Sequence, residues 1–564
     1  MKELLSQAKL ARYVYLIFLL GLAFFLRVVG IRFGLPDLYH ADEPIVVNHA
    51  FAYGTWDLNP HFFKLPPLVS YLLFVIYGFY FLLGHAFGLF KNLREFINLF
   101  LVNPSSFYLV GRVFFGAVIG TLTVYSLFKL IQKYFSEQHA FLSALMLAIC
   151  FLHVRDSHYI YVDIPLLFVL VLCFFPILQM TKDNARQHYI LFGFLAGAAV
   201  ATKYNGVFIF IPFLVSHFLK NPSKSLYGNL FLAFITAFAV YGLLNPFSLL
   251  DFRFFLSELL GQSHAEGSSG LIHHLIYSLM AGLGVPMFVF SILGSIAAII
   301  SRDVKKYILS SFIFGYYIVL CFFSQPYDRY VLPLIPFLCF FAADFLLALR
   351  SKCKLSSIFY FFLIALTVLP SIVKVYLSDY LFIRKDVRTI AKEWVEQTLP
   401  AGAKVALDNS FYAPRLKLSV DQLKQKEHEI SAAFHIGAER KRIEVLLNSA
   451  QAKNVPRYSL YFLKDRPDLK PFIFSTPTVL YNVNYLKQNG IEYIVTCRLR
   501  SDFNQQFYSD LEKRAKLLVT FSPYKDSLRE WPIDSMPLTG GPLLWSELIA
   551  RKANGQIIKI YELE

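Results

Sequence analysis

The sequence is dominated by long apolar segments that alternate with short polar connections. An apolar segment of roughly 17–25 residues is long enough to cross a bilayer as a helix. Hydrophobic residues make up 56% of the chain and charged residues only 16%, whereas about a quarter of a soluble protein is charged. We therefore predict a polytopic α-helical membrane protein with about eleven transmembrane helices. The predicted spans are residues 13–30, 107–130, 140–153, 160–180, 189–201, 207–219, 229–246, 275–300, 307–323, 331–349 and 355–377.

One further apolar segment, residues 66–90, is ambiguous, and the basic clusters between the later spans decide how it lies. If the N-terminus is cytoplasmic and 66–90 does not cross, all five clusters fall on the cytoplasmic side, as the positive-inside rule requires. If 66–90 crosses, all five fall outside. We therefore predict a juxtamembrane or re-entrant segment at 66–90, within a first outer loop of about residues 31–106. The five clusters are Lys129/Lys133, Lys182/Arg186, Lys220/Lys224, Arg302/Lys305/Lys306 and Arg350/Lys352/Lys354.

The composition changes after about residue 378, where apolar runs shorten and charged residues become frequent. A helical spacing of apolar residues at 387–396 is followed by short strand patterns, and alternating helices and strands are typical of an α/β domain. The same topology places this part outside the cytoplasm. We predict a transmembrane domain at 1–378 and a soluble extracytoplasmic α/β domain at 379–564. The predicted strands are 404–407, 491–496 and 557–563.

Charge, cysteines and missing motifs exclude several classes of function. The formal net charge is +16, but the basic residues do not form the single aromatic-studded patch of a nucleic-acid-binding protein. The six cysteines show neither a disulfide framework nor a metal-ligand spacing. No Walker loop, Rossmann glycine fingerprint or Gly-x-Ser-x-Gly motif is present in the sequence. A nucleotide substrate is therefore not predicted.

The first outer loop holds the strongest candidates for chemistry. Asp42 and Glu43 are adjacent carboxylates that follow the first span. Mutual repulsion raises at least one pKa of such a pair, which suits a general base. The alternatives are a metal ligand, a solvated carboxylate, or the acidic start of a helix before Pro44. Lys64 lies at the mouth of the next apolar segment, where a lysine either holds a phosphate or extends toward lipid headgroups.

Two more carboxylates lie at the predicted outer face. Asp156 and Asp163 flank the outer start of one predicted span. A carboxylate within a membrane is costly, so its presence indicates a function. For Asp156 the alternative is a simple ion pair with its neighbour Arg155.

Three cations also lie at the predicted outer ends of spans. Lys203 interrupts an apolar hairpin at its outer tip, and Arg112 lies near the outer end of the second predicted span. Arg329 either binds a phosphate or pairs with the adjacent Asp328. The connections on the cytoplasmic side are short by comparison. This asymmetry predicts an active site that faces away from the cytoplasm.

Histidines raise the question of a metal ion. The candidate ligands His40, Glu43, His61 and His264 show no spacing diagnostic of zinc, such as His-Glu-x-x-His. The sequence therefore requires no cofactor, although a divalent metal is left open.

The order of these residues resembles the polyprenyl-phosphate-sugar glycosyltransferases of the GT-C fold, most closely the protein O-mannosyltransferase and lipid A aminoarabinose transferase families. The resemblance begins with Leu-Pro-x-x-x-His-x-Asp-Glu at 35–43 and Asn-Pro-His-x-x-x-x-Pro-Pro at 59–67, and it extends over essentially the whole chain. The later matches are Arg112 with Gly116 and Gly120, Arg155 through Pro165, Thr202-Lys203-Tyr204, Arg329-Tyr330 with Pro333 and Pro336, Asp386-Val-Arg388, Trp394 and residues 489–495.

The resemblance implies a helical membrane domain whose first outer loop carries a catalytic aspartate and juxtamembrane helices. It implies that Asp42 deprotonates the acceptor hydroxyl as this attacks the anomeric carbon, with inversion. Lys64 matches a lysine that contacts the donor phosphate, and Lys203 and Arg329 are further phosphate contacts. In the aminoarabinose transferases a metal-binding glutamate precedes that lysine, whereas this chain has Phe63. The difference argues against a metal and against lipid A as acceptor.

We therefore predict a multi-pass hexosyl- or pentosyltransferase of the cell membrane. It moves a sugar from a polyprenyl-phosphate donor to a protein, lipid or glycan on the outer face, and its C-terminal domain helps to choose that acceptor. An oligosaccharyltransferase-like enzyme with a diphosphate carrier is one alternative. A lipid-linked-sugar transporter or flippase is another, but its inverted repeats are not seen. The predicted catalytic residues are Asp42 and Glu43, and the predicted substrate contacts are Lys64, Arg112, Asp156, Asp163, Lys203, Tyr204, Arg329 and Tyr330.

Overall fold

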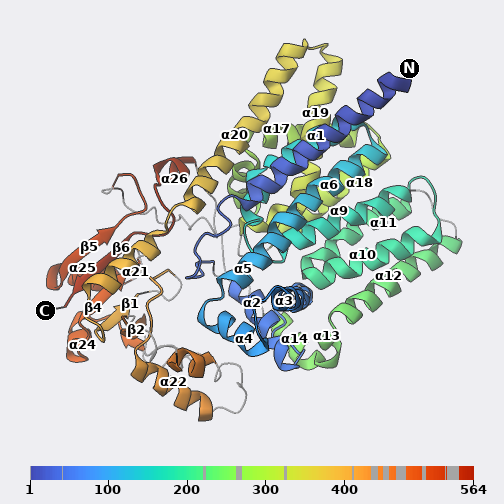
Figure 1. The fold of residues 1–564 in the computed structure, drawn as a ribbon. Helices are drawn as coiled ribbons and strands as arrows, with labels where there is room; N and C mark the ends of the chain where they lie inside the picture. The colour runs from blue at the N-terminus through green and yellow to red at the C-terminus, as the bar shows by residue number, and fades with distance from the viewer. Residues whose placement is uncertain are drawn as a thin grey trace.

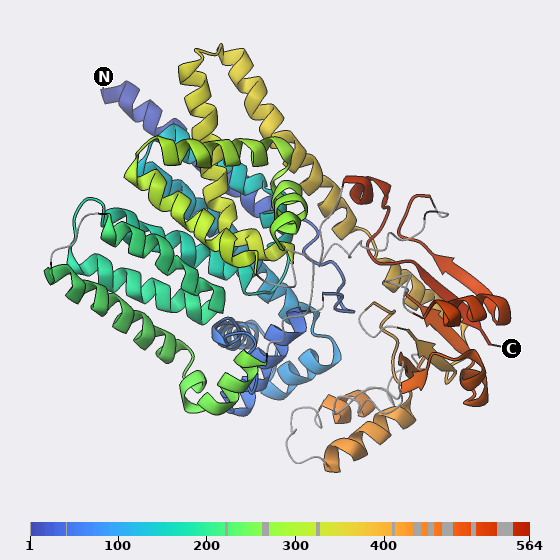
Figure 2. The ribbon, with the colours of Figure 1, turned by 180° about the vertical axis from the view of Figure 1, so that it is seen from behind.

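The computed structural model describes residues 2–40, 42–219, 224–261, 270–322, 327–408, 412–432, 442–448, 456–464, 478–497, 504–526, 529 and 545–563. The helices up to residue 383 pack side by side in a bundle, and the strands lie together beside it (Figure 1). The long helix α20 leads from the bundle to the sheet, and the N-terminus lies on the side away from the sheet (Figure 1). The view from behind shows the same two parts (Figure 2).

The bundle and its outer loops consist of helices, with short 3₁₀ or π segments labelled η. In chain order these are α1 (Lys2–Val28), α2 (Glu43–Ala52), η1 (Tyr53–Thr55), α3 (Leu68–Ala86), α4 (Leu93–Val102), α5 (Ser105–Gly111), η2 (Arg112–Val118), α6 (Ile119–Tyr134), α7 (Glu137–Ile149), α8 (Phe151–Asp156), α9 (Asp163–Gln179), α10 (Arg186–Thr202), η3 (Tyr204–Ile209), α11 (Phe210–Phe218), α12 (Lys224–Leu244), α13 (Phe247–Leu250), α14 (Phe252–Leu260), α15 (Gly270–His273), η4 (His274–Met280), α16 (Ala281–Leu283), α17 (Val285–Ile300), α18 (Val304–Leu320), η5 (Asp328–Leu334), α19 (Ile335–Lys352) and α20 (Ser357–Ile383).

Each predicted apolar span contains helix, because a backbone in lipid must satisfy its own hydrogen bonds. Within the described ranges, five helical stretches are long and apolar enough to cross a membrane, or six if the bent pair Gly270–Leu283 and Val285–Ile300 is one span. That pair bends by 115° at Gly284, whose φ of +85° favours glycine. The predicted total of about eleven spans is not confirmed by this measure, because several predicted spans form shorter helices such as α9.

The segment predicted to lie along the membrane is α3. It is also one of the five helices long enough to cross. In both ribbon views α3 is seen along its axis, whereas α1, α6, α9 and α10 run across the view (Figures 1 and 2). It packs with α2 and α4 in a buried apolar cluster that contains Val47, Leu73, Tyr77, Phe96 and Phe100. The helix α3 therefore runs across the direction of these bundle helices, and its position at the membrane surface stays a prediction.

Polar clusters lie at opposite ends of the bundle. At one end, Lys306 at the start of α18 pairs with Asp344 near the end of α19 (2.6 Å). At this same end Lys305 donates to the carbonyl of Tyr134, where α6 ends (2.9 Å). The polar residues predicted for the outer face lie at the other helix ends, at the starts of α2, α9 and η5. Lys305 and Lys306 thus lie at the other helix ends from these predicted outer-face residues, and Lys220 of another basic cluster lies outside the described residues.

The strands form one mixed sheet with the order β3-β2-β1-β4-β6-β5. β1 pairs in parallel with β2 and β4, β2 pairs in parallel with β3, and β6 is antiparallel to β4 and β5. The three strands predicted from the sequence are confirmed as β1, β4 and β6. The elements of this part are α21 (Val387–Thr398), β1 (Lys404–Leu407), α22 (Val420–Ala432), β2 (Ser459–Lys464), β3 (Thr478–Leu480), α24 (Val483–Gln488), β4 (Tyr493–Thr496), α25 (Gln505–Arg514), β5 (Lys516–Phe521), α26 (Trp545–Ala550) and β6 (Ile558–Glu562).

Helices cover both faces of this sheet, because successive strand side chains point to opposite faces. Val405 and Leu407 of β1 share a buried cluster with Ala391 and Val395 of α21. Ala406, between them, belongs to a second cluster that contains residues of α24 and α25. The helix α21 is therefore fixed by the sheet, which matters for the site below.

Candidate active site

The start of α2 carries the two predicted catalytic carboxylates, and a buried histidine fixes this helix end. Asp42 directly precedes α2, and Glu43 is its first residue. The Nδ1 atom of His40 accepts the backbone N–H groups of Asp42 (3.2 Å) and Glu43 (3.3 Å), which have no partner inside the helix. Burial, together with nearby arginines, lowers the pKa of His40 well below its usual value. The neutral ring keeps Nδ1 as an acceptor, so His40 acts as a helix cap.

Glu43 and Arg112 form a fully buried ion pair. Nε and Nη2 of Arg112 donate to the two carboxylate oxygens of Glu43 (2.8 and 2.7 Å), and the Ile160 N–H adds a third bond (2.9 Å). Nη1 of Arg112 donates to the carbonyls of Ile31 and Phe33 (2.7 and 2.9 Å). Both residues are 0% exposed. The sequence predicts catalysis by Glu43 and a substrate contact by Arg112. In the structure both side chains are buried and bonded to each other, which indicates a structural role for the pair.

Asp42 stays partly open and is paired with Arg329. Nη2 of Arg329 lies 3.2 Å from Oδ2 of Asp42, and 25% of the Asp42 side chain is exposed. The guanidinium lies over the rings of Tyr327 (4.6 Å) and Tyr161 (5.2 Å). Its Nε is buried and has no hydrogen-bond partner among the described residues. A buried donor without an acceptor is costly, so this N–H is suited to an anion placed beside Asp42.

Arg155 joins two acidic side chains behind this pair. Its Nη1 donates to Asp328 (2.6 Å), and its Nη2 donates to Asp156 (2.7 Å). The ion pair weighed for Asp156 is therefore present, and Asp328 is held by Arg155 while Arg329 binds Asp42. Burial raises the pKa of Asp156 to about 6, against the opposing charge of Arg155.

A second cation lies close by on the hairpin between α10 and η3. Nζ of Lys203 is 2.7 Å from Oδ1 of Asp163 and 5.0 Å from the centre of the Tyr330 ring. The other oxygen of Asp163 is buried and has no hydrogen-bond partner within the described ranges. The neighbouring Tyr204 donates its hydroxyl to the Phe63 carbonyl (2.8 Å). The structure thus brings together residues that are up to 167 positions apart, from 163 to 330.

These groups line one small cavity beside Asp42. Its volume is about 10 Å³, which is room for about one water molecule. A ligand larger than a water molecule does not fit inside this cavity, whereas the Asp42 side chain is 25% exposed. A larger, mostly apolar cavity of about 540 Å³ lies between α2, α3 and α4 and shares none of these residues. The small cavity is lined by His40, Arg155, Asp156, Tyr159, Tyr161, Asp163, Ile164, Asp328 and Arg329.

Lys64 lies on the same outer loop but outside this cavity. It is exposed, and its neighbour Phe63 donates its N–H to Glu258 of α14 (2.9 Å). On the same stretch, Asn59 donates to Asp251 (3.1 Å). The residues before α3 are therefore held by α14 and η3, and Lys64 is an exposed residue on this fixed stretch.

Comparison with known proteins reveals the fold family. Residues 95–247 match the model of the dolichyl-phosphate-mannose-protein mannosyltransferase family. The structure of apo ArnT from Cupriavidus metallidurans superimposes with a TM-score of 0.51 at 14% identity over 90% of this chain and 96% of that one. The chain has the GT-C glycosyltransferase fold. Together with its apolar helices, this fold makes it a multi-pass membrane protein.

Two more solved structures share this similarity. ArnT bound to undecaprenyl phosphate has a TM-score of 0.51 at 13% identity, over 97% of each chain. The Archaeoglobus fulgidus oligosaccharyltransferase has a TM-score of 0.49 at 14% identity, over 90% of this chain and 72% of that one. The comparison with curated proteins found no match.

The family match and the site overlap only in part. The matched residues 95–247 include Arg112, Asp163 and Lys203, whereas Asp42 and Arg329 lie outside them. The ion pair between Asp42 and Arg329 is therefore observed in this structure and not covered by the family match.

The metal candidates are dispersed. His40 caps α2 and Glu43 is bound to Arg112, as described above. His61 is exposed and pairs with Asp57 (3.0 Å), and His264 lies outside the described residues. Among the residues that the structure describes, no group of three or more His, Cys, Asp or Glu side chains is placed to hold a metal ion.

The site also contains residues that the sequence analysis does not single out. Tyr159 stacks on His40 with ring centres 4.2 Å apart, and Tyr161 and Tyr327 lie against the Arg329 guanidinium. Their place in the sequence could have pointed to them, because each tyrosine lies within four residues of a predicted site residue at the predicted outer end of a span. Tyrosine is so common in this chain, at 34 copies, that this signal alone does not single them out.

Proposed function

We propose that this chain is a membrane glycosyltransferase that moves a sugar from a polyprenyl-phosphate donor to an acceptor hydroxyl outside the cytoplasm. The observation that carries the proposal is the pair of Asp42 and Arg329. A partly exposed carboxylate touches a guanidinium whose Nε has no partner among the described residues. One arginine is then in reach of both a base and an anionic leaving group.

The mechanism follows from these two groups. The acceptor hydroxyl donates its proton to Asp42 as its oxygen attacks the anomeric carbon. The bond from this carbon to the phosphate oxygen breaks, and the bonding electrons leave with the lipid phosphate. The exposed part of the Arg329 guanidinium, whose side chain is 17% exposed, binds the phosphate as its charge develops, and charge-assisted bonds of this kind are the strong ones. Attack opposite the leaving phosphate inverts the anomeric centre.

Two other cations add positive charge to the proposed phosphate site. Lys203 lies over the ring of Tyr330, which is adjacent to Arg329, and Lys64 extends from the loop that precedes α3. We assign both to the donor phosphate. The buried pair of Glu43 and Arg112 holds α2 in place and takes no part in proton transfer.

The nature of the donor is supported by the fold relatives. ArnT is seen with undecaprenyl phosphate, and the family matched by residues 95–247 is described by dolichyl-phosphate-mannose. Both ligands are lipid phosphates. An N-terminus in the cytoplasm and a C-terminal domain outside would put Asp42 at the outer leaflet, where a lipid-linked sugar is available and a nucleotide sugar is not.

The proposal is tested by sugar transfer from a radiolabelled polyprenyl-phosphate sugar in membranes that contain the full-length protein. We expect Asp42→Asn to bind donor but to transfer at least about a hundredfold more slowly than wild type, the ordinary loss of a general base. The matched control is Asp57→Asn, because Asp57 is on the same outer loop and its side chain is 60% exposed.

Three results would contradict the proposal. Equal transfer by wild type and Asp42→Asn would make Asp42 structural. Movement of label across the bilayer without transfer would favour a lipid-linked-sugar transporter. Transfer only from a diphosphate carrier would favour an oligosaccharyltransferase-like enzyme.

A further inference from the structure

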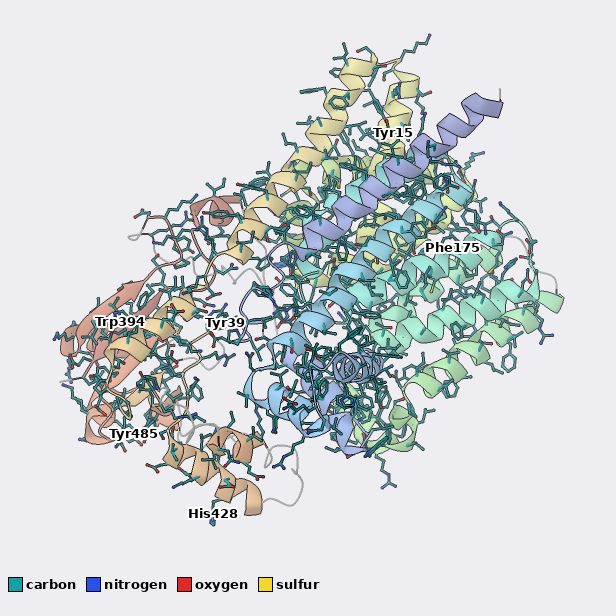
Figure 3. All side chains as sticks on the ribbon, in the orientation of Figure 1. Tyr15, Tyr39, Phe175, Trp394, His428 and Tyr485 are labelled. Atoms are coloured by element: carbon teal, nitrogen blue, oxygen red, sulfur yellow. The ribbon has the colours of Figure 1, made fainter. Side chains whose placement is uncertain are left out.

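Side chains of α21 hold the loop that leads to Asp42. Nζ of Lys392 pairs with Oδ1 of Asp37, and these side chains are 15% and 7% exposed. One turn earlier, the hydroxyls of Thr389 and Tyr39 are 2.8 Å apart. Figure 3 shows Tyr39 between the helical bundle and the part of the chain that carries Trp394. The loop after α1 is therefore in direct contact with the first helix of the C-terminal part.

Arg388 supplies a third contact, against the face of the Tyr39 ring. Its guanidinium lies 3.8 Å from the centre of the Tyr39 ring. Asp386, the cap of α21, holds it from behind through Nε (2.8 Å) and Nη2 (2.7 Å). Arg388 is 2% exposed and Tyr39 is 3% exposed. A planar cation fixed by two bonds is a rigid surface for a ring, so Tyr39 has little freedom to move.

The restraint reaches Asp42 through the side chain of His40. His40 follows Tyr39 in the sequence, and its ring accepts the N–H of Asp42 (3.2 Å). Its other face stacks on Tyr159. Between the clamped Tyr39 and the carboxylate of Asp42 lie only two residues, and one of them is itself bonded to the start of α2. The direction of the Asp42 carboxylate toward Arg329 thus depends on where α21 holds Tyr39.

We propose that Arg388, Thr389 and Lys392 are positioning residues for the general base, so that the C-terminal domain takes part in catalysis by aiming Asp42. This inference rests on the function proposed above. It differs from the expectation that the domain acts only through the choice of acceptor. A base misplaced by about 1 Å costs up to about a hundredfold in rate, which sets the size of the effect.

The experiment measures kcat and donor KM for full-length variants with a labelled polyprenyl-phosphate sugar. Thr389→Val removes the hydroxyl and keeps the shape, whereas Thr389→Ser keeps the hydroxyl. Lys392→Asp and Asp37→Lys each break the ion pair, and the double variant restores it in reverse. The matched control is Glu393→Gln, because Glu393 is on α21 and 45% exposed, and it pairs with Lys385 away from the loop.

We expect each broken contact to lower kcat by about tenfold or more while donor KM changes less than about threefold, since only the transition state needs the aimed base. We expect Thr389→Ser to stay near wild type and the reversed pair to regain most of the lost kcat, as in a double-mutant cycle. A purely structural role would instead lower the amount of folded protein and leave kcat per folded molecule unchanged.

Two outcomes overturn the inference in distinguishable ways. If wild type transfers sugar and Asp42→Asn does not, but Thr389→Val and Lys392→Asp keep wild-type kcat, the positioning role is wrong and the proposed function stands. If wild type transfers no sugar, the proposed function fails and the positioning role fails with it.

Discussion

Replacing Glu43 tests whether its carboxylate stabilises the fold or takes part in catalysis. Glu43→Gln keeps the shape of the side chain but removes the charge that meets Arg112 at 2.7 Å in a site that is 0% exposed. Removing one partner of a buried ion pair costs about 3–5 kcal/mol, because the other charge stays buried without compensation. Glutamine still accepts one bond from Arg112, so we expect the lower end, about 3 kcal/mol, which is roughly a hundredfold in the folding equilibrium.

The assay for this prediction is thermal unfolding of the detergent-solubilised full-length protein, followed by transfer activity per folded molecule at low temperature. We expect a clear loss of stability for Glu43→Gln with activity per folded molecule within about threefold of wild type. Glu95→Gln is the matched control, because Glu95 is an exposed acid on α4 of the same outer loop. Wild-type stability combined with at least about a hundredfold slower transfer would refute the scaffold role and restore Glu43 as a catalytic candidate.

Three further predictions follow from single contacts. Arg329→Lys keeps a charge but loses the planar guanidinium whose Nη2 contacts Asp42, so we expect kcat/KM for the donor to fall by about tenfold or more in the transfer assay; an unchanged value would contradict the phosphate contact. Burial raises the pKa of Asp408 to about 6, so the folded state keeps a proton that the unfolded state loses above about pH 4. Stability should therefore fall as pH rises from about 4 to 6, and Asp408→Asn should remove this slope in thermal unfolding. In Gly116→Ala the new Cβ would lie 1.9 Å from the Ser157 carbonyl oxygen, so we expect a loss of about 1–3 kcal/mol or more in the same assay, and wild-type stability would contradict this close packing.

Much of the fold was accessible to sequence reasoning because it depends on local hydrophobicity. Each predicted apolar segment contains helix, and the strand patterns at 404–407, 491–496 and 557–563 became β1, β4 and β6. The 115° break at Gly284 is not among the predictions, because the predicted span 275–300 treats Gly282, Gly284 and Pro286 as part of one continuous apolar run. Local pattern thus located the elements, but it did not show where a helix is interrupted by packing.

The site was only partly predictable, because burial and pairing are properties of the tertiary structure. Asp42 and Glu43 look equivalent in the sequence, yet one is 25% exposed and the other is enclosed by Arg112 and Ile160. The partner of Asp42 is 287 positions away at Arg329, which no spacing rule connects. Asp328 was weighed as the partner of its neighbour Arg329, but the fold brings Arg155 to it instead.

The contact between Tyr39 and Thr389 spans 350 positions, and this separation has a consequence for biogenesis. The loop with Asp42 leaves the ribosome long before α21 is made, so a growing chain holds the proposed base before it holds the residues that we propose position it. Activity should appear only when translation is nearly finished. The same contact limits domain exchange among related enzymes: a C-terminal domain grafted from another chain would have to bring a matching loop with it.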